Sequence, residues 1–228
     1  MKKILTEKEE IFDKAQEYET NWWVRHIKNE LKPTSRDWMV GYQDHVGRGH
    51  IARFGLNADN RFWTLNPPCI DGSIMDLGSG IVSFFEGKEM DVIAVEPSLG
   101  RLKKHFPELV VIGQSRNVFY HAGEIYDYRH NAVENVWCCN MLDHTPDWVA
   151  ILDIEIPRVL KENGRLFLSV DCRNGNVKMD AGHLTAFSPG LLSRHLEKNF
   201  VRIWSSPARK GVDFYRWDYI GVAKSAGI

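Results

Sequence analysis

The sequence predicts an α/β protein, a three-layer sandwich with a mostly parallel seven-stranded sheet and an antiparallel last strand. From about residue 73 onward, short apolar runs alternate with helical patterns, which is typical of parallel sheets covered by helices on both faces. The last two apolar runs follow each other without a helical pattern, so the final pair of strands is expected to be antiparallel. Residues 1–70 are richer in Trp and charged residues and predict an N-terminal helical cap, or lid, over a domain of residues 71–228.

The N-terminal region is expected to begin with one or two helices within residues 6–31. Thr6 and Glu9 have the spacing of a capping box, and apolar residues then recur at helical spacing. Residues 33–68 follow no single pattern, and they end in Asn66-Pro67-Pro68, which favours a turn before the first strand.

The other elements are expected to alternate along the chain. The apolar runs predict strands at residues 73–77, 91–95, 109–112, 135–139, 164–170, 201–204 and 214–222. Helical patterns predict helices at residues 98–105, 148–161 and 189–198. Ser98 is expected to cap the first of these helices.

The composition excludes several classes of protein. The 228 residues suit one domain with a small appendage, and 43% hydrophobic residues are enough for a packed core, which excludes general disorder. The 29 Lys and Arg against 30 Asp and Glu give a net charge of −1, without the basic excess of nucleic-acid binders. No stretch approaches the roughly 18 apolar residues of a membrane span. We therefore expect a small-molecule partner, no nucleic acid and no membrane insertion, whereas the oligomeric state stays open.

The cysteines and the N-terminus indicate a cytoplasmic protein. Cys69, Cys138, Cys139 and Cys172 form no CxxC pair and no zinc-finger spacing, so we expect reduced, structural thiols. No group of His, Asp and Glu has convincing ligand spacing, so no metal is expected. The apolar stretch near the N-terminus is only two residues long, too short for a signal peptide.

A glycine-rich turn carries the strongest chemical signal. The sequence Asp76-Leu77-Gly78-Ser79-Gly80 follows an apolar strand, and two glycines there allow a tight turn and close approach of the backbone to a ligand. Glu96 ends the next strand, where a carboxylate can accept hydrogen bonds from both hydroxyls of a ribose. Two other interpretations remain: a turn that binds nothing, and a Glu96 that caps the helix beginning near Ser98.

These residues resemble the motifs of class I S-adenosylmethionine-dependent methyltransferases, particularly those that act on small molecules, over residues 70–205. The resemblance also rests on the segments 122–124, 133–144, 156–166 and 183–188. It implies a Rossmann-like fold and transfer of a methyl group to an O, N or C atom of a small-molecule acceptor. The residues that it implies for the cofactor are Asp76, Gly78, Ser79, Gly80, Glu96, Pro97, Ser98, Gly123, Glu124 and Asn140.

The sequence departs from the family pattern at two positions. Val82 stands where the family usually has a third glycine, so the helix after the loop is expected to begin differently. Glu134 stands where Asp is frequent. Neither change removes a group that must contact the cofactor.

Three other functions compete with this interpretation. An NAD-binding oxidoreductase would fit Gly78-x-Gly80-x-x-Ser83 and Glu96, although Asp76 would repel a pyrophosphate. A nucleic-acid methyltransferase would use Asn66-Pro67-Pro68-Cys69, but too few residues separate this segment from Asp76 for the intervening strands. The last alternative is a methyltransferase-like binding protein, or partner subunit, without turnover.

The catalytic candidates follow the fourth predicted strand. His144 is the leading general base, because imidazole titrates near neutral pH, with Asp143 as a further catalytic candidate and His121 and His183 as secondary ones. The alternative is that His144 only packs at the start of a helix. Trp22, Trp23 and Trp38 are candidates for an acceptor lid, with core packing as the alternative for each.

Overall fold

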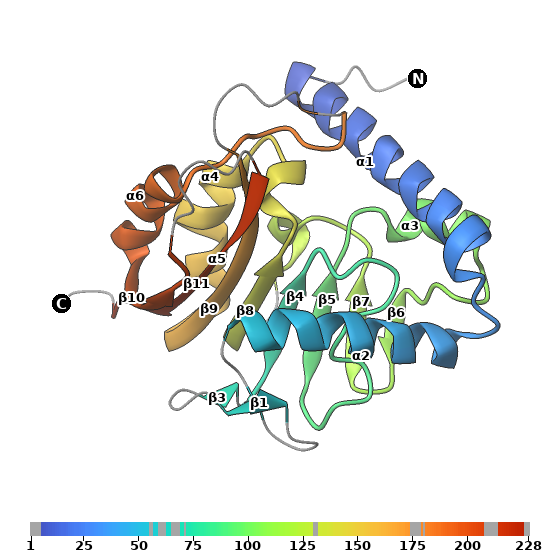
Figure 1. Ribbon diagram of the computed structural model, residues 1–228, viewed down its shortest axis with the longest axis horizontal. Helices are drawn as coiled ribbons and strands as arrows, with labels where there is room; N and C mark the ends of the chain where they lie inside the picture. The colour runs from blue at the N-terminus through green and yellow to red at the C-terminus, as the bar shows by residue number, and fades with distance from the viewer. Residues whose placement is uncertain are drawn as a thin grey trace.

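An eight-stranded sheet forms the centre of the computed structural model, which describes residues 6–54, 57–58, 63–64, 69–70, 72–129, 132–173, 179, 181–207 and 214–225 (Figure 1). In spatial order its strands are β10 (Phe200–Ser205), β11 (Phe214–Ala223), β9 (Leu160–Arg173), β8 (Val133–Cys139), β4 (Ile74–Leu77), β5 (Val92–Val95), β7 (Val118–His121) and β6 (Gly113–Ser115). Strands β9, β8, β4, β5 and β7 pair in parallel. The antiparallel β11 lies between β9 and β10. The predicted mostly parallel sheet with an antiparallel last strand is therefore confirmed.

The sheet has eight strands rather than the predicted seven, and the predicted strand at residues 109–112 is wrong. Leu109 and Val110 are buried, but their N–H groups donate to the carbonyl of Phe106, so this apolar run closes the end of helix α3 (Leu99–His105). On the side away from β4, β5 pairs with β7. Strand β6 forms an antiparallel hairpin with β7. Burial beneath a helix end, rather than in a sheet, explains the apolar pattern.

Helices cover the sheet on both faces (Figure 1). On one face lie α4 (Trp148–Ala150), a π-helical turn (Ile151–Glu155), α5 (Ile156–Val159) and α6 (Pro189–Asn199), packed on a core that includes Val136, Leu168 and Trp217. The predicted helix over residues 148–161 ends two residues early, because Leu160 is extended and begins β9. Short 3-10 turns at Ile125–Asp127 and Leu142–His144 complete this side.

The other face is covered by α3 and by a helix that the sequence did not predict, α2 (Arg36–Arg53). The three glycines of α2 lower its helix propensity, which explains why its pattern was unclear. Gly47 lies so close to Phe84 that a Cβ atom there would be 1.8 Å from the ring. The segment between Gly78 and Asp91 forms turns and contains no helix, so α2 packs directly on it. The chain after Val82 therefore forms turns, in agreement with the expectation that this segment departs from the family pattern.

The N-terminal helix α1 (Glu7–His26) begins with the predicted capping box of Thr6 and Glu9 and continues into a π-helical turn (Ile27–Leu31). Strands β1 (Asn57–Ala58), β2 (Trp63–Thr64) and β3 (Cys69–Ile70) form a separate antiparallel sheet. Except for Cys69, the Asn66-Pro67-Pro68-Cys69 segment lies outside the described residues. None of the described helices has the length and apolar content to cross a bilayer.

Candidate active site

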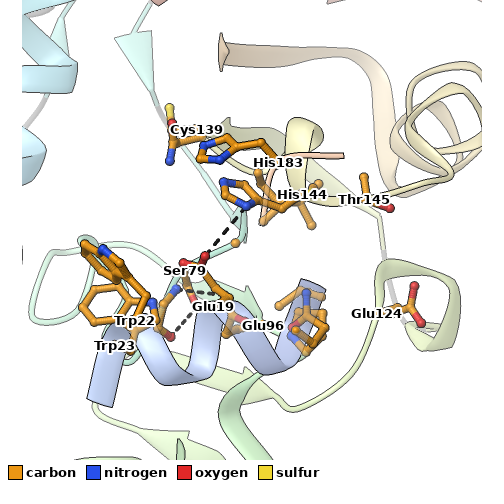
Figure 2. Close-up of a pocket in the computed structure, with 18 of the residues that line it drawn as sticks. Glu19, Trp22, Trp23, Ser79, Glu96, Glu124, Cys139, His144, Thr145 and His183 are labelled. Atoms are coloured by element: carbon orange, nitrogen blue, oxygen red, sulfur yellow. Dashed lines mark hydrogen bonds and ion pairs between the residues drawn. The ribbon is translucent and has the colours of Figure 1, made fainter. Parts of the chain in front are cut away.

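A cavity of about 480 Å³ lies at the carboxyl ends of the parallel strands, beneath α1. Its floor is formed by the residues that follow β4, β5 and β8, the position where ligands bind open α/β sheets. One wall, the α1 wall, consists of Phe12, Gln16, Tyr18, Glu19, Trp22, Trp23 and His26. Figure 2 shows Trp22 and Trp23 at one end of this cavity and Glu124 at the other. This size is within the usual range of small-molecule sites.

The glycine loop after β4 leaves no room for side chains. Gly78 and Gly80 have φ values of +75° and +63°, in the left-handed region that glycine favours. A Cβ atom on Gly78 would lie 2.8 Å from the Met141 side chain, and one on Gly80 would lie 3.0 Å from the Trp23 ring. Both glycines and Ser79 line the cavity, so this backbone can approach a ligand closely.

Glu96 links the glycine loop to the start of α3. Its Oε2 accepts the N–H of Gly80 at 3.1 Å, and its Oε1 accepts the N–H of Ser98 at 2.8 Å. Each carboxylate oxygen has two acceptor positions, so each retains one for a ribose hydroxyl. Both expectations for Glu96 are therefore compatible, because a carboxylate that caps the helix start also faces the cavity. The Ser98 side chain makes no capping hydrogen bond, so Glu96, rather than Ser98, has the capping role.

Asp76 lies behind the loop and does not line the cavity. Its carboxylate accepts a hydrogen bond from Ser83 Oγ at 2.6 Å and is 4% exposed. The pKa of Asp76 is raised to about 7, mainly by burial and also by the charge of Glu96, against the lowering effect of the Ser83 hydrogen bond. The structure thus places Asp76 under the turn, outside the lining of the cavity.

Of the other predicted cofactor residues, some line the cavity and others lie behind those that do. Pro97, Glu124 and Asn140 line the cavity. Ser98 is fully buried behind Glu96, and Gly123 precedes Glu124 without lining the cavity itself.

Asn140, which follows β8, is held in place from β11, the strand beyond β9 in the sheet. It has a positive φ of 57° and accepts a hydrogen bond from Arg216 of β11 at 2.7 Å. This contact fixes the turn that follows β8.

The catalytic candidates form a cluster at the edge of the cavity. His144 and His183 line it, with ring centroids 4.6 Å apart (Figure 2). His144 Nδ1 is 2.9 Å from the carbonyl of Gly182, which can only accept, so this nitrogen carries the proton and Nε2 keeps a lone pair. Asp143 is 1% exposed, and its carboxylate lies 3.9 Å from His144 Nε2 and 3.6 Å from His183 Nε2.

Asp143 is a buried carboxylate. Neither of its oxygens has a hydrogen-bond partner among the described residues. Burial raises the pKa of Asp143, whereas the nearby His144 and His183 lower it. A proton on either histidine would compensate its negative charge. His121, the other secondary candidate, does not line the cavity.

The same cluster has a spacing that could admit a metal ion. Donor atoms of Asp143, His144 and His183 lie within 4.8 Å of one another. The sequence did not indicate this group, because His183 is far from the other two along the chain. The two imidazole rings are tilted by 41° to each other, with centroids 4.6 Å apart. The absence of a metal stays a prediction.

Sequence reasoning identified part of the α1 wall. Trp22 and Trp23 line the cavity as expected, but Trp38 instead stacks on Tyr42, with centroids 5.7 Å apart and an angle of 7°. Glu19 was missed, although its Oε2 is 3.7 Å from His144 Nδ1 (Figure 2). Its position three and four residues before the tryptophans puts it on the same helix face, and this spacing was the signal that could have found it.

Comparisons with known proteins agree with this geometry. Residues 75–168 match the family model described as a methyltransferase domain. The Burkholderia thailandensis 1,6-didemethyltoxoflavin-N1-methyltransferase, solved with S-adenosylhomocysteine, is 15% identical with a TM-score of 0.58, covering 99% of this chain and 94% of that one. The N-methyltransferase NodS from Bradyrhizobium japonicum, also solved with S-adenosylhomocysteine, is 9% identical with a TM-score of 0.56, covering 92% and 100%. No curated protein is similar enough in sequence to count as a match.

The fold is one that solved methyltransferases share. The mostly parallel sheet with an antiparallel β11 is the Rossmann-like fold of these solved methyltransferases. In this chain a glycine loop follows β4 and an acid follows β5. The matched segment begins in β4 and ends in β9, so it contains the glycine loop, Glu96 and His144. Residues 75–168 are thus similar to a methyltransferase domain.

Proposed function

We propose that this protein transfers the methyl group of S-adenosylmethionine to an O, N or C atom of a small-molecule acceptor. The observation that carries the proposal is one continuous cavity, which joins the glycine loop and Glu96 to His144 beneath the α1 wall. A small acceptor agrees with the net charge of −1, which offers no basic surplus to a nucleic acid. The acceptor in the Burkholderia structure is likewise a small molecule, 1,6-didemethyltoxoflavin.

The residues around the cavity fit the cofactor. Glu96 would hold the ribose, the backbone of Gly78, Ser79 and Gly80 would lie against the amino-acid portion, and Pro97, Glu124 and Asn140 would surround the adenine. Asp76, Ser98 and Gly123 support these residues from behind. The bound cofactor supplies a methyl group activated by a positive sulfur. The protein therefore has to orient the acceptor, exclude water and remove a proton.

His144 is the general base in this proposal. Its Nδ1–H donates to Gly182, which leaves the Nε2 lone pair to take a proton from the acceptor. Asp143 lies next to Nε2 and would stabilise the resulting imidazolium. The backbone carbonyl of Asp143 accepts the N–H groups of Leu184 and Thr185, at 2.6 and 3.3 Å, which keeps the segment with His183 beside the base.

The domain division and the cellular location are also proposals. Residues 1–70 would act as the cap over the domain of residues 71–228, which the α1 wall supports. The α2 part of this region shares a core with the sheet through Met39, Ile51 and Phe54, so we expect it to fold together with the domain. The free thiols of Cys138 and Cys172 support a cytoplasmic location.

Methyl transfer can be tested directly with methyl-labelled cofactor and metabolite extracts. We expect S-adenosylhomocysteine release and one labelled small molecule. His144→Gln should lower kcat by about 100- to 10,000-fold and leave S-adenosylhomocysteine affinity within about twofold of the wild-type value. His105→Gln, an exposed histidine in α3, is the matched control and should keep both. Cofactor binding without any labelled acceptor would instead favour a methyltransferase-like binding protein.

A further inference from the structure

The α1 wall carries a carboxylate that the proposed cofactor contacts do not use. The Glu19 side chain is 28% exposed and lines the cavity, 3.7 Å from His144 Nδ1. That distance is beyond a hydrogen bond, and the same nitrogen already donates to Gly182. Gln16, one turn earlier on the same wall, has a buried Oε1 that accepts no hydrogen bond among the described residues.

The charges around the cavity are unbalanced. Glu19, Glu96 and Glu124 line it, and Arg216 is the only Lys or Arg among the described residues that does so. The Arg216 charge is already compensated, because its Nε donates to Asp171 at 2.7 Å. The cavity therefore has an excess of negative charge.

Burial raises the pKa of Glu19, and the charges of Glu96 and Asp143 raise it further, while His144 and His183 lower it. This direction is expected for a carboxylate that lacks a cationic partner.

Aromatic rings line the same cavity as this carboxylate. Trp22 stacks on His26, with centroids 4.7 Å apart and an angle of 22°, and packs edge to face with Trp23 at 5.1 Å. Tyr42 of α2 also lines the cavity. A carboxylate beside aromatic faces binds organic cations, because the ring quadrupole and the negative charge both attract positive charge.

We infer that the methyl acceptor is a protonated amine on a flat or apolar body, bound by Glu19 and the rings of Trp22 and Trp23. The inference rests on the proposed methyl transfer and specifies its acceptor class. An amine cation supplies both the charge that the cavity lacks and the hydrogen-bond donors that Glu19 can accept.

Proton and electron balance are complete for methylation at this nitrogen. The ammonium gives one proton to His144 Nε2, and the lone pair of the neutral amine forms the new N–C bond. The S–CH₃ bond breaks, and its electron pair stays on sulfur. The products are a methylammonium ion, S-adenosylhomocysteine and one proton, which passes from His144 to water. Glu19 faces a cation both before and after the transfer.

The test compares three probes with the same aromatic body and different charges. Phenethylamine, phenethyl alcohol and hydrocinnamate are titrated by calorimetry into the protein saturated with S-adenosylhomocysteine. We expect the amine to bind at least about 10-fold more tightly than the alcohol, with the carboxylate weakest. Equal binding of all three, tighter binding of the carboxylate, or no binding of any probe at millimolar concentration would overturn the inference.

A pair of variants on α1 separates the roles of Glu19. Glu19→Gln should abolish the preference for the amine and leave S-adenosylhomocysteine affinity within about twofold. Glu17→Gln removes the same charge from the exposed face of α1 and should keep the preference. If Glu19→Gln weakens the cofactor and spares the amine preference, the carboxylate serves the cofactor and the inference is wrong. Failure of the wild-type protein to bind S-adenosylhomocysteine would instead contradict the proposed function.

Discussion

Glu96 receives two backbone hydrogen bonds in the protein without ligand, so its loss should affect both folding and cofactor binding. Glu96→Ala should weaken S-adenosylhomocysteine by about 10- to 100-fold, because two charge-assisted hydrogen bonds to the ribose disappear. It should also lower the free energy of unfolding by about 1–3 kcal/mol, because the N–H groups of Gly80 and Ser98 lose their acceptor. Calorimetric titration and urea denaturation of the same variant measure both effects. Unchanged affinity with lowered stability would leave Glu96 a purely structural residue.

Asp76 should make the stability of the empty protein depend on pH. Its pKa in the folded state is raised to about 7 by burial, above that of an unfolded carboxyl near about 4. Between these values the folded state binds more protons than the unfolded state, so stability falls as the pH rises from about 4 to about 7. Asp76→Asn should remove this contribution, on the order of 2–4 kcal/mol, and flatten the profile. Urea denaturation at several pH values measures it, and parallel profiles for the two proteins would contradict the assignment.

The cluster of Asp143, His144 and His183 should work without a metal ion. Incubation with a chelator, followed by buffer exchange, should leave the rate of methyl transfer unchanged. Activity lost on chelation and restored by one divalent ion would show that the donor atoms within 4.8 Å of one another are ligands.

Helix α2 provides a matched test of packing against the turns after the glycine loop. Gly47→Ala should lower the free energy of unfolding by about 1–3 kcal/mol, because the new Cβ atom overlaps the Phe84 ring. Gly49→Ala, in the same helix with nothing within 4 Å, should raise it by about 0.5–1 kcal/mol through helix propensity. Thermal denaturation compares the two variants. A stabilising Gly47→Ala would show that α2 does not pack on this segment.

The elements that the sequence predicted are those whose local pattern agrees with their burial. Strands β4, β5 and β8 are short apolar runs in the sheet interior, and the glycine loop has a composition that few other turns share. Helix α2 was not predicted because its three glycines lower its helix propensity, although only Gly47 among them is packed closely, against Phe84. The run at residues 109–112 was misassigned because burial against a helix end gives the same apolar pattern as a strand.

The candidate site was predictable where it follows strand ends and not where it depends on distant contacts. Glu96 and His144 follow β5 and β8, so the order of strands places them at one edge of the sheet. Glu19 was not predicted, because acidic residues on a surface helix are common and only the packing of α1 over the cavity distinguishes this one. The contact of His183 with Asp143 likewise depends on how the chain returns after β9.

At the scale of the whole molecule, the central claim is that the cavity under α1 binds the cofactor through the glycine loop. Gly80→Asp tests it, because the new side chain would fill the approach and meet the Trp23 ring. Gly100→Asp, an exposed position of α3 with nothing within 4 Å, is the matched control. Calorimetric titration with S-adenosylhomocysteine should give saturable binding for the wild-type protein and the control. The Gly80→Asp variant should give none, with an unchanged circular dichroism spectrum. Absence of binding to the wild-type protein at millimolar ligand, or wild-type affinity in Gly80→Asp, would contradict the claim.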